Sequence, residues 1–150
     1  GLIIISLTFM PMRSIANYYV QYMPFLKALA DIESGNNPRA VGTKGEVSAY
    51  QILPKVWAEV DPNLPMVADN ITNIQKSGRV AAKLLRKLQQ LYIKATGSRP
   101  SPQDLYIMWN RGFDFYSKRN FVVSNIEYKT LVETANRYNN LVEVYRRKCL

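Results

Sequence analysis

The sequence predicts a mainly α-helical domain with one short irregular or hairpin loop after the first helix. Apolar residues recur at helical spacing in several segments. Prolines open some of these segments, and glycines follow several of their ends. We expect residues 1–150 to form a single compact domain, because no internal repeat, low-complexity tract or long linker divides them. The hydrophobic share of 47% is ordinary for a globular protein and too high for a disordered one.

The first predicted helix runs from Pro24 to about Ser34. Proline suits the first turn of a helix, because its fixed φ angle fits there and its missing N–H is not needed. An apolar stripe at helical spacing follows it: Phe25, Leu26, Ala28, Leu29 and Ile32. Gly35 is placed to end this helix. The polar, glycine-bearing stretch 35–47 predicts a loop or short hairpin.

Three further helical segments are expected in the middle of the chain. A short one covers 49–53, and another opens with Pro54 and reaches about Val60. We expect Asp69 to cap a long helix through Ala95, with Gly97 ending it. The apolar face of that helix consists of Ile74, Ala81, Leu84, Leu85, Leu88, Leu91 and Ala95.

Two helices are expected in the last third of the chain. Residues 101–104 (Ser-Pro-Gln-Asp) supply a capping hydroxyl, a first-turn proline and a carboxylate near the positive end of the helix dipole. The helix that they open carries residues 105–110 and stops near Gly112. A final amphipathic helix runs from about Ile126 to Arg147.

The N-terminal stretch has two interpretations. Residues 2–12 are mostly apolar, and residues 14–16 (Ser-Ile-Ala) have the small-x-small pattern of a signal-peptidase site. We expect residues 1–16 to be either the end of a signal peptide or an N-terminal segment, with a buried segment slightly favoured. The stretch is too short to span a bilayer, so we expect no membrane span.

Composition excludes several kinds of chemistry. The chain contains no histidine, which removes His-based acid/base catalysis, Ser-His-Asp and Cys-His nucleophiles and His-ligated metal sites. A single cysteine cannot form an internal disulfide. Twenty Lys and Arg against 11 Asp and Glu give a charge of +9, which favours polyanionic partners. These cations are scattered along the chain, so we expect a solvated basic surface and no nucleic-acid partner.

Glu33 is the candidate catalytic residue. It lies at the end of an otherwise apolar helix, just before a glycine-bearing loop. The negative end of the helix dipole and apolar surroundings both disfavour an ionised carboxylate there. The pKa of Glu33 should therefore be raised, so that the protonated group can serve as a general acid. An ordinary surface glutamate at a helix end is the alternative that its position alone leaves open.

The sequence around Glu33 resembles the soluble lytic transglycosylase family. The family pattern is a glutamate-serine pair, then proline and alanine five and seven residues after the glutamate, glycine at twelve, glutamine at eighteen and proline at twenty-one. The chain matches without a gap at Glu33, Ser34, Asn37, Pro38, Ala40, Gly45, Gln51 and Pro54. A second family element, Ala-Tyr-Asn-x-Gly, resembles residues 108–112 (Met-Trp-Asn-Arg-Gly). A third, a late Glu-Thr followed by an aromatic that closes the cleft, resembles Glu133-Thr134 and Tyr138.

The resemblance covers roughly residues 25–141 and has departures. Glu46 and Ser48 stand where the family has small residues, and Ala49-Tyr50 stand where it has Leu-Met. Trp109 replaces the usual tyrosine. Because the glutamate itself is retained, these departures affect the expected sugar contacts more than the expected reaction.

The resemblance implies a lysozyme-like α+β fold and an enzyme that cleaves the glycan strands of peptidoglycan without cofactor or metal. Glu33 would protonate the glycosidic oxygen between N-acetylmuramic acid and N-acetylglucosamine, and the substrate's N-acetyl group would stabilise the developing cation. The ionised Glu33 would then take the proton of the muramic O6 hydroxyl, closing a 1,6-anhydro ring. We expect a monomer that acts in the cell envelope: periplasmic, secreted or virion-associated.

Substrate-binding residues are expected in three groups. Ser34, Gln51 and Asn110 supply hydroxyl and amide groups suited to sugars. The flat faces of Tyr50, Trp109 and Tyr138 could meet sugar rings. Gly45 and Glu46 belong to the loop that should border the cleft.

Two alternatives stay open. A goose-type lysozyme, in which water replaces the O6 hydroxyl, would need a carboxylate to activate that water. Its candidates are Glu46, Asp104 and Asp114. A non-catalytic wall-binding or structural module of a phage particle or secretion apparatus is the other alternative.

Overall fold

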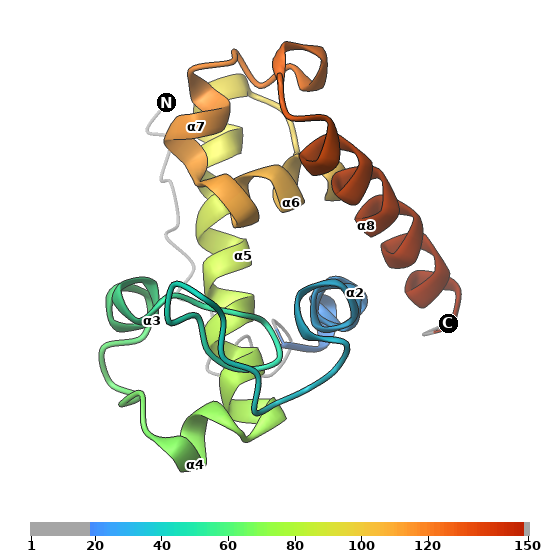
Figure 1. Cartoon of the computed structure of the whole chain (residues 1–150). Helices are drawn as coiled ribbons and strands as arrows, with labels where there is room; N and C mark the ends of the chain where they lie inside the picture. Colours follow the sequence, from blue (N-terminus) through green and yellow to red (C-terminus); the bar gives the residue numbers. More distant parts are fainter. Residues whose placement is uncertain (1–18, 149–150) are drawn as a thin grey trace, which may run out of the picture.

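The computed structural model describes residues 19–148, and their fold is mainly helical and lysozyme-like, as predicted (Figure 1). The interpretation of residues 1–16 lies outside the described residues. The helices are α2 (Met23–Ser34), α3 (Pro54–Val60), α4 (Ala68–Ile71), α5 (Ile74–Thr96), α6 (Pro102–Arg111), α7 (Phe113–Ser117) and α8 (Lys129–Lys148), with a 3₁₀-helical turn over Val123–Asn125. Within 19–148, no helix is both long and apolar enough to cross a membrane.

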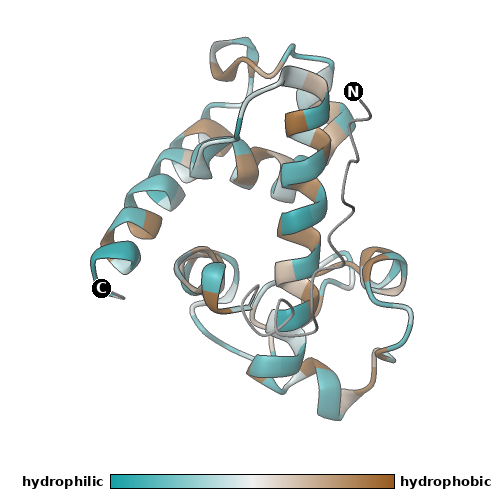
Figure 2. Cartoon of the chain, turned by 180° about the vertical axis from the view of Figure 1, so that it is seen from behind, coloured by the Kyte–Doolittle hydropathy of each residue, from teal (hydrophilic) through white to brown (hydrophobic). Residues whose placement is uncertain are grey.

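Helix α5 is the centre of the fold. It contacts α2, α3, α4, α6 and α7, while α8 packs against α2 and α6 (Figure 1). Polar and apolar residues alternate along α5 and α8, as expected for amphipathic helices (Figure 2). The buried face of α5 includes Val80, Ala81, Leu85 and Leu88. Helices α2 and α6 thus both contact α5, and the loop before α3 adds Val47 and Ile52 to the same core.

Helix α2 begins and ends as its sequence predicts. Pro24 lies in its first turn, and Leu26 and Leu29 are buried in the core. Gly35 follows the last turn at φ +62°, a left-handed conformation that glycine adopts without steric cost. Its N–H donates to the carbonyl of Asp31 at 3.1 Å, which satisfies one of the free carbonyls at the helix end.

The segment 49–53 is a tight turn, so the helix predicted there is wrong. Ser48 and Gln51 have φ angles of +75° and +53°, which a right-handed helix excludes. The backbones of Val47 and Ile52 pair in both directions across the turn, at 3.0 and 2.9 Å. Val47 also pairs with Val41, so the predicted loop or hairpin after α2 is a compact set of turns joined by isolated bridges.

Helix α5 begins later than predicted. Asp69 belongs to the separate short helix α4, which ends before Thr72, so the predicted long helix is interrupted there. Asn73 is the capping residue: its side chain accepts the N–H groups of Gln75 and Lys76 at 3.1 and 3.0 Å. The predicted end at Gly97 is confirmed.

The C-terminal part holds two further differences. Helix α7 was not predicted, and it follows Gly112, whose φ of +88° ends α6. Helix α8 begins at Lys129, because Ile126 has extended backbone after the 3₁₀-helical turn. The start of α6 is as predicted: Ser101 and Asp104 cap each other's backbone N–H groups.

Candidate active site

Glu33, in the last turn of α2, lines a pocket of about 190 Å³. The other lining residues are Lys44, Glu46, Gln51, Ile52, Leu53, Val56, Leu84, Trp109 and Asn110. They come from the loop after α2 and from α3, α5 and α6, which the fold brings together around the end of α2. The pocket thus joins the two most specific sequence elements, the block after Glu33 and the Trp109-Asn110 pair.

The carboxyl group of Glu33 lies in a poorly solvated position. Its Oε1 atom is buried and has no hydrogen-bond partner among residues 19–148. Burial raises the pKa of Glu33, a hydrogen bond from the Tyr106 hydroxyl lowers it, and the negative charge of Glu46 raises it again. The net shift is upward, so the group keeps its proton at a higher pH than a solvated glutamate would.

Tyr106 is a functional candidate at the site that sequence reasoning missed. It is buried on α6, and its hydroxyl interacts with the side chains of both Glu33 and Asn110. Burial, followed by the charge and hydrogen bond of Glu33, raises the pKa of Tyr106, so its hydroxyl stays protonated and can donate. The signal that could have found it is its spacing: Tyr106 and Asn110 are four residues apart and share one face of a helix.

Glu46 is held in the pocket by its own loop. Its Oε2 atom accepts the backbone N–H of Lys44 at 2.8 Å. Gly42 leaves the room that this carboxylate needs, because a Cβ at position 42 would lie 2.3 Å from Oε2 of Glu46 and 2.8 Å from Oε1 of Gln51. The missing side chain of Gly42 therefore lets two pocket residues approach the backbone.

Ser34 and Gln51 stabilise the loop beside the pocket. The Ser34 hydroxyl donates to the carbonyl of Ala49 at 2.7 Å and accepts the N–H of Asn37 at 3.1 Å. The amide nitrogen of Gln51 donates to the carbonyls of Ser48 and Ala40, at 2.9 and 3.1 Å. Only Gln51 of the two lines the pocket, and their contacts with sugar remain predictions.

Two aromatic residues predicted to stack on sugars lie in the core. Tyr138 is fully buried, and its hydroxyl donates to the carbonyl of Phe25 at 3.2 Å. Tyr50 is 3% exposed, and burial raises its pKa. Their ring faces pack against protein, so the stacking role is wrong for both. Trp109 is only half-buried and lines the pocket, where its ring can meet a ligand.

The remaining predicted positions lie outside the pocket lining. Gly45 is exposed at φ +80° and shapes the turn that carries Glu46. Asp104 caps α6 and accepts the hydroxyl of Tyr116 at 2.5 Å. Asp114 is exposed on α7. Glu46 is therefore the acidic residue that shares the pocket with Glu33.

This geometry suits proton transfer by a carboxyl group. A protonated Glu33 beside a small polar-walled pocket can donate to a bound leaving group, and Tyr106 can stabilise the carboxylate that results. The polar groups of Gln51 and Asn110 and the ring of Trp109 are the kinds of groups that sugars contact.

The transglycosylase SLT domain model matches residues 11–112, more than half of the chain. No curated protein and no solved structure matches the chain. The matched residues include Glu33, the loop after it and the Trp109-Asn110 pair. The chain belongs to the transglycosylase SLT domain family, which supports a lytic-transglycosylase type of activity on peptidoglycan, outside the cytoplasm.

Proposed function

We propose that the chain is a peptidoglycan lytic transglycosylase that cleaves the MurNAc-β-1,4-GlcNAc bond and leaves a 1,6-anhydroMurNAc end, with Glu33 as general acid and base. The observation that supports this most is the state of the Glu33 carboxyl. It is poorly solvated, its pKa is raised, and it faces a pocket lined by sugar-compatible groups. In a chain without histidine, such a carboxyl is the natural proton donor near neutral pH.

The proposed reaction uses one carboxyl group twice. Protonated Glu33 donates its proton to the glycosidic oxygen, the bond to muramic C1 breaks, and the substrate's N-acetyl oxygen stabilises the cation at C1. Carboxylate Glu33 then takes the proton of the O6 hydroxyl while O6 bonds to C1, which restores the acid. No water enters, because the nucleophile is already part of the substrate and has a high effective concentration. The hydroxyl of Tyr106 supports the ionised state between the two steps.

The decisive substitution is Glu33→Gln. An amide can neither donate the acid proton nor accept the O6 proton, so cleavage of purified peptidoglycan should fall to background. Glu59→Gln is the matched control, because Glu59 is an exposed glutamate on α3 that does not line the pocket and lies outside the family pattern. Near-normal cleavage by Glu33→Gln would overturn the assignment of Glu33. No cleavage by the wild type would favour the non-catalytic wall-binding alternative.

A hydrolytic muramidase is the second candidate, because Glu46 supplies a second carboxylate in the Glu33 pocket. An inverting hydrolase needs a second carboxylate roughly 6.5–9.5 Å from the acid to activate water. Glu46 lines the same pocket, but its Oε2 atom already accepts a backbone N–H. Mass spectrometry of the products separates the two reactions, since an anhydro end is one water lighter than a reducing end.

Under the lyase proposal, wild type and Glu46→Gln both release anhydro ends, and the substitution lowers the rate only modestly. Reducing ends from the wild type that disappear in Glu46→Gln would show hydrolysis instead. We propose that the chain acts in the cell envelope, as a periplasmic, secreted or virion-associated protein.

A further inference from the structure

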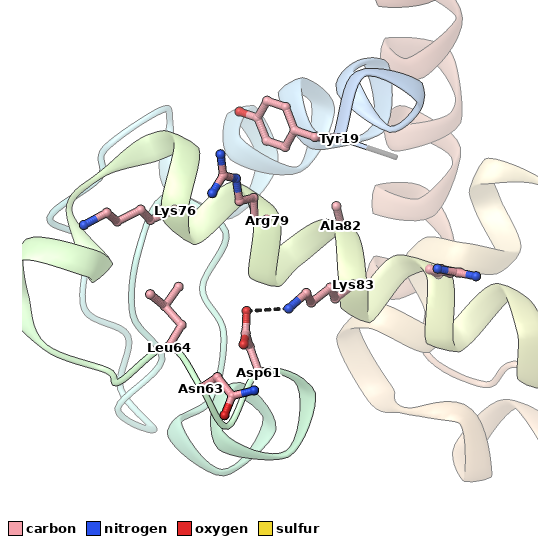
Figure 3. Close-up of a pocket in the computed structure, with 9 residues that line it drawn as sticks. Tyr19, Asp61, Asn63, Leu64, Lys76, Arg79, Ala82 and Lys83 are labelled. Carbon is pink, nitrogen blue, oxygen red and sulfur yellow. Dashed lines mark hydrogen bonds and ion pairs between the residues drawn. The ribbon is translucent and has the colours of Figure 1, made fainter. Parts of the chain in front are cut away.

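A larger pocket, of about 470 Å³, shares no lining residue with the Glu33 pocket. Figure 3 shows this larger pocket. It is bounded by α5 and by the segment that follows α3, including Asp61 and Leu64. Leu84 lines the Glu33 pocket, whereas Lys83 and Arg86 line this one. Since successive helix positions differ by about 100°, the two pockets lie on different faces of α5. We call the larger one the α5 pocket.

The α5 pocket is rich in positive charge. Its cations are Lys76, Arg79, Lys83 and Arg86. One carboxylate, Asp61, forms an ion pair with Lys83 at 2.8 Å. Lys76 donates to the neutral amide oxygen of Asn70 at 3.1 Å and forms no ion pair within the described residues. Arg79 makes no ion pair with any residue in 19–148.

The spacing of these cations disfavours the helix that carries them. Lys76 and Arg79 are three residues apart, and Arg79 and Lys83 are four apart, so like charges lie side by side on one face. They also lie far from the C-terminal turn of α5 at Thr96, where the helix dipole would favour cations. A bound anion would offset this repulsion.

Apolar groups complete the walls of the α5 pocket. Tyr19, Leu64 and Ala82 line it together with the cations (Figure 3). Gly78 lets Tyr19 lie against α5, because a Cβ at position 78 would be 2.8 Å from the Tyr19 ring. The pocket thus offers apolar surface beside positive charge, and its volume lies in the range that holds compact organic ligands.

These features select the chemistry of the ligand. Small apolar groups of a ligand can contact Leu64 and Ala82 while its carboxylates meet Lys76 and Arg79. A polyol phosphate chain has no apolar groups to fill that surface. Single-stranded nucleic acid needs several stacking platforms, and Tyr19 is the one aromatic residue among the lining residues in 19–148.

We propose that the α5 pocket binds a short acidic peptide with small apolar side chains, and that this peptide is a stem of the polymer whose glycan is cleaved at Glu33. The second clause rests on the proposed function, and the first does not. Holding a peptide on one face of α5 would keep the chain on the wall while the glycan is processed at another face.

The test is calorimetric titration of the full chain with a stem tetrapeptide released from peptidoglycan. The double variant Lys76→Gln/Arg79→Gln should bind it about tenfold more weakly than the wild type, a difference of about 1.4 kcal/mol. The matched control is Lys118→Gln/Arg99→Gln, which removes one lysine and one arginine from exposed positions elsewhere and should bind like the wild type. A tetrapeptide with amidated carboxyl groups should also bind about tenfold more weakly to the wild type.

Several results would overturn the proposal: no binding by the wild type, equal weakening in the control, or tighter binding of poly(glycerol phosphate) or oligothymidylate than of the peptide. Hydrogen exchange on the wild type provides a test without substitution, because the peptide should protect residues lining the α5 pocket. Glu33→Gln should bind the peptide normally, so loss of glycan cleavage and loss of peptide binding are separate outcomes.

Discussion

Glu33→Gln should stabilise the fold while it removes activity. The pKa of Glu33 is raised above its ordinary value of 4.5, so the folded chain retains this proton at pH values where the unfolded chain has lost it. The unfolded state then binds fewer protons, and the contribution of Glu33 to the free energy of unfolding falls as pH rises from about 4.5 through the folded pKa. A glutamine carries no charge and escapes this penalty.

The size of the effect follows from one atom. Oε1 of Glu33 is buried without a partner among the described residues, and leaving such a group unsatisfied costs about 1–3 kcal/mol, more when it is charged. A glutamine amide still leaves an unpartnered polar atom there but carries no charge, so it removes only the extra cost of the charge, and we expect Glu33→Gln to raise the free energy of unfolding above neutral pH by about 1 kcal/mol. For a chain of this length, each kcal/mol corresponds to about 2–4 °C in Tm.

Urea denaturation of wild type and variant across the range from acid to alkaline pH measures this difference. The gain should be largest at high pH and should shrink toward zero below pH 4.5, where both side chains are neutral. Glu59→Gln, at an exposed position, should change stability by less than about 0.5 kcal/mol at every pH. A Glu33→Gln variant that is less stable than the wild type at high pH, or whose gain does not depend on pH, would refute the reasoning.

Three further predictions concern activity. Tyr106→Phe removes the hydrogen bond that lowers the pKa of Glu33, so the rate should begin to fall at a higher pH than in the wild type. Glu46→Gln removes a negative charge that raises the pKa of Glu33, so the rate should begin to fall at a lower pH. The pH–rate profiles of the two variants measure these opposite shifts. Trp109→Ala should raise KM for glycan strands about fivefold, since an aromatic contact contributes about 1 kcal/mol, with kcat less affected. Added salt should lower cleavage of whole cell walls more than of a short uncharged chitooligosaccharide, because screening weakens the attraction of the +9 chain.

Local sequence signals predicted most of the helices, because their starts and stops depend on a few residues. The sequence predicted the start of α2 at Pro24 and its end at Gly35. It also predicted the cap of α6 by Ser101 and Asp104. The turn at 49–53 was not predicted because the residues with left-handed backbone are Ser48 and Gln51, and serine and glutamine, unlike glycine, do not signal a positive φ angle in a sequence. The interruption before α5 was not predicted because aspartate and asparagine both suit the N-cap position, so local sequence does not decide between Asp69 and Asn73.

The candidate site divides along a similar line. Glu33, Gln51 and Asn110 were predicted from matches to the family pattern, whereas Glu46 and Trp109 were predicted at positions where the chain departs from it. The structure brings all five into one pocket. Periodicity could not separate an aromatic residue that faces a cleft from one that faces the core. For that reason Tyr138 was assigned to the substrate and is buried.

The role of Tyr106 depends on a contact between α6 and the end of α2, which the helical spacing of Tyr106 and Asn110 does not by itself show. Burial alone would hold the Glu33 carboxyl as an acid and oppose the carboxylate that the second half of the reaction needs. The Tyr106 hydroxyl acts in the other direction, since it favours the ionised form. The same hydroxyl interacts with Asn110, a pocket residue suited to sugar contacts. A substrate that engages Asn110 would therefore alter the hydrogen bond to Glu33, which couples glycan binding to the balance between the acid and base forms of the one carboxyl group that performs both steps.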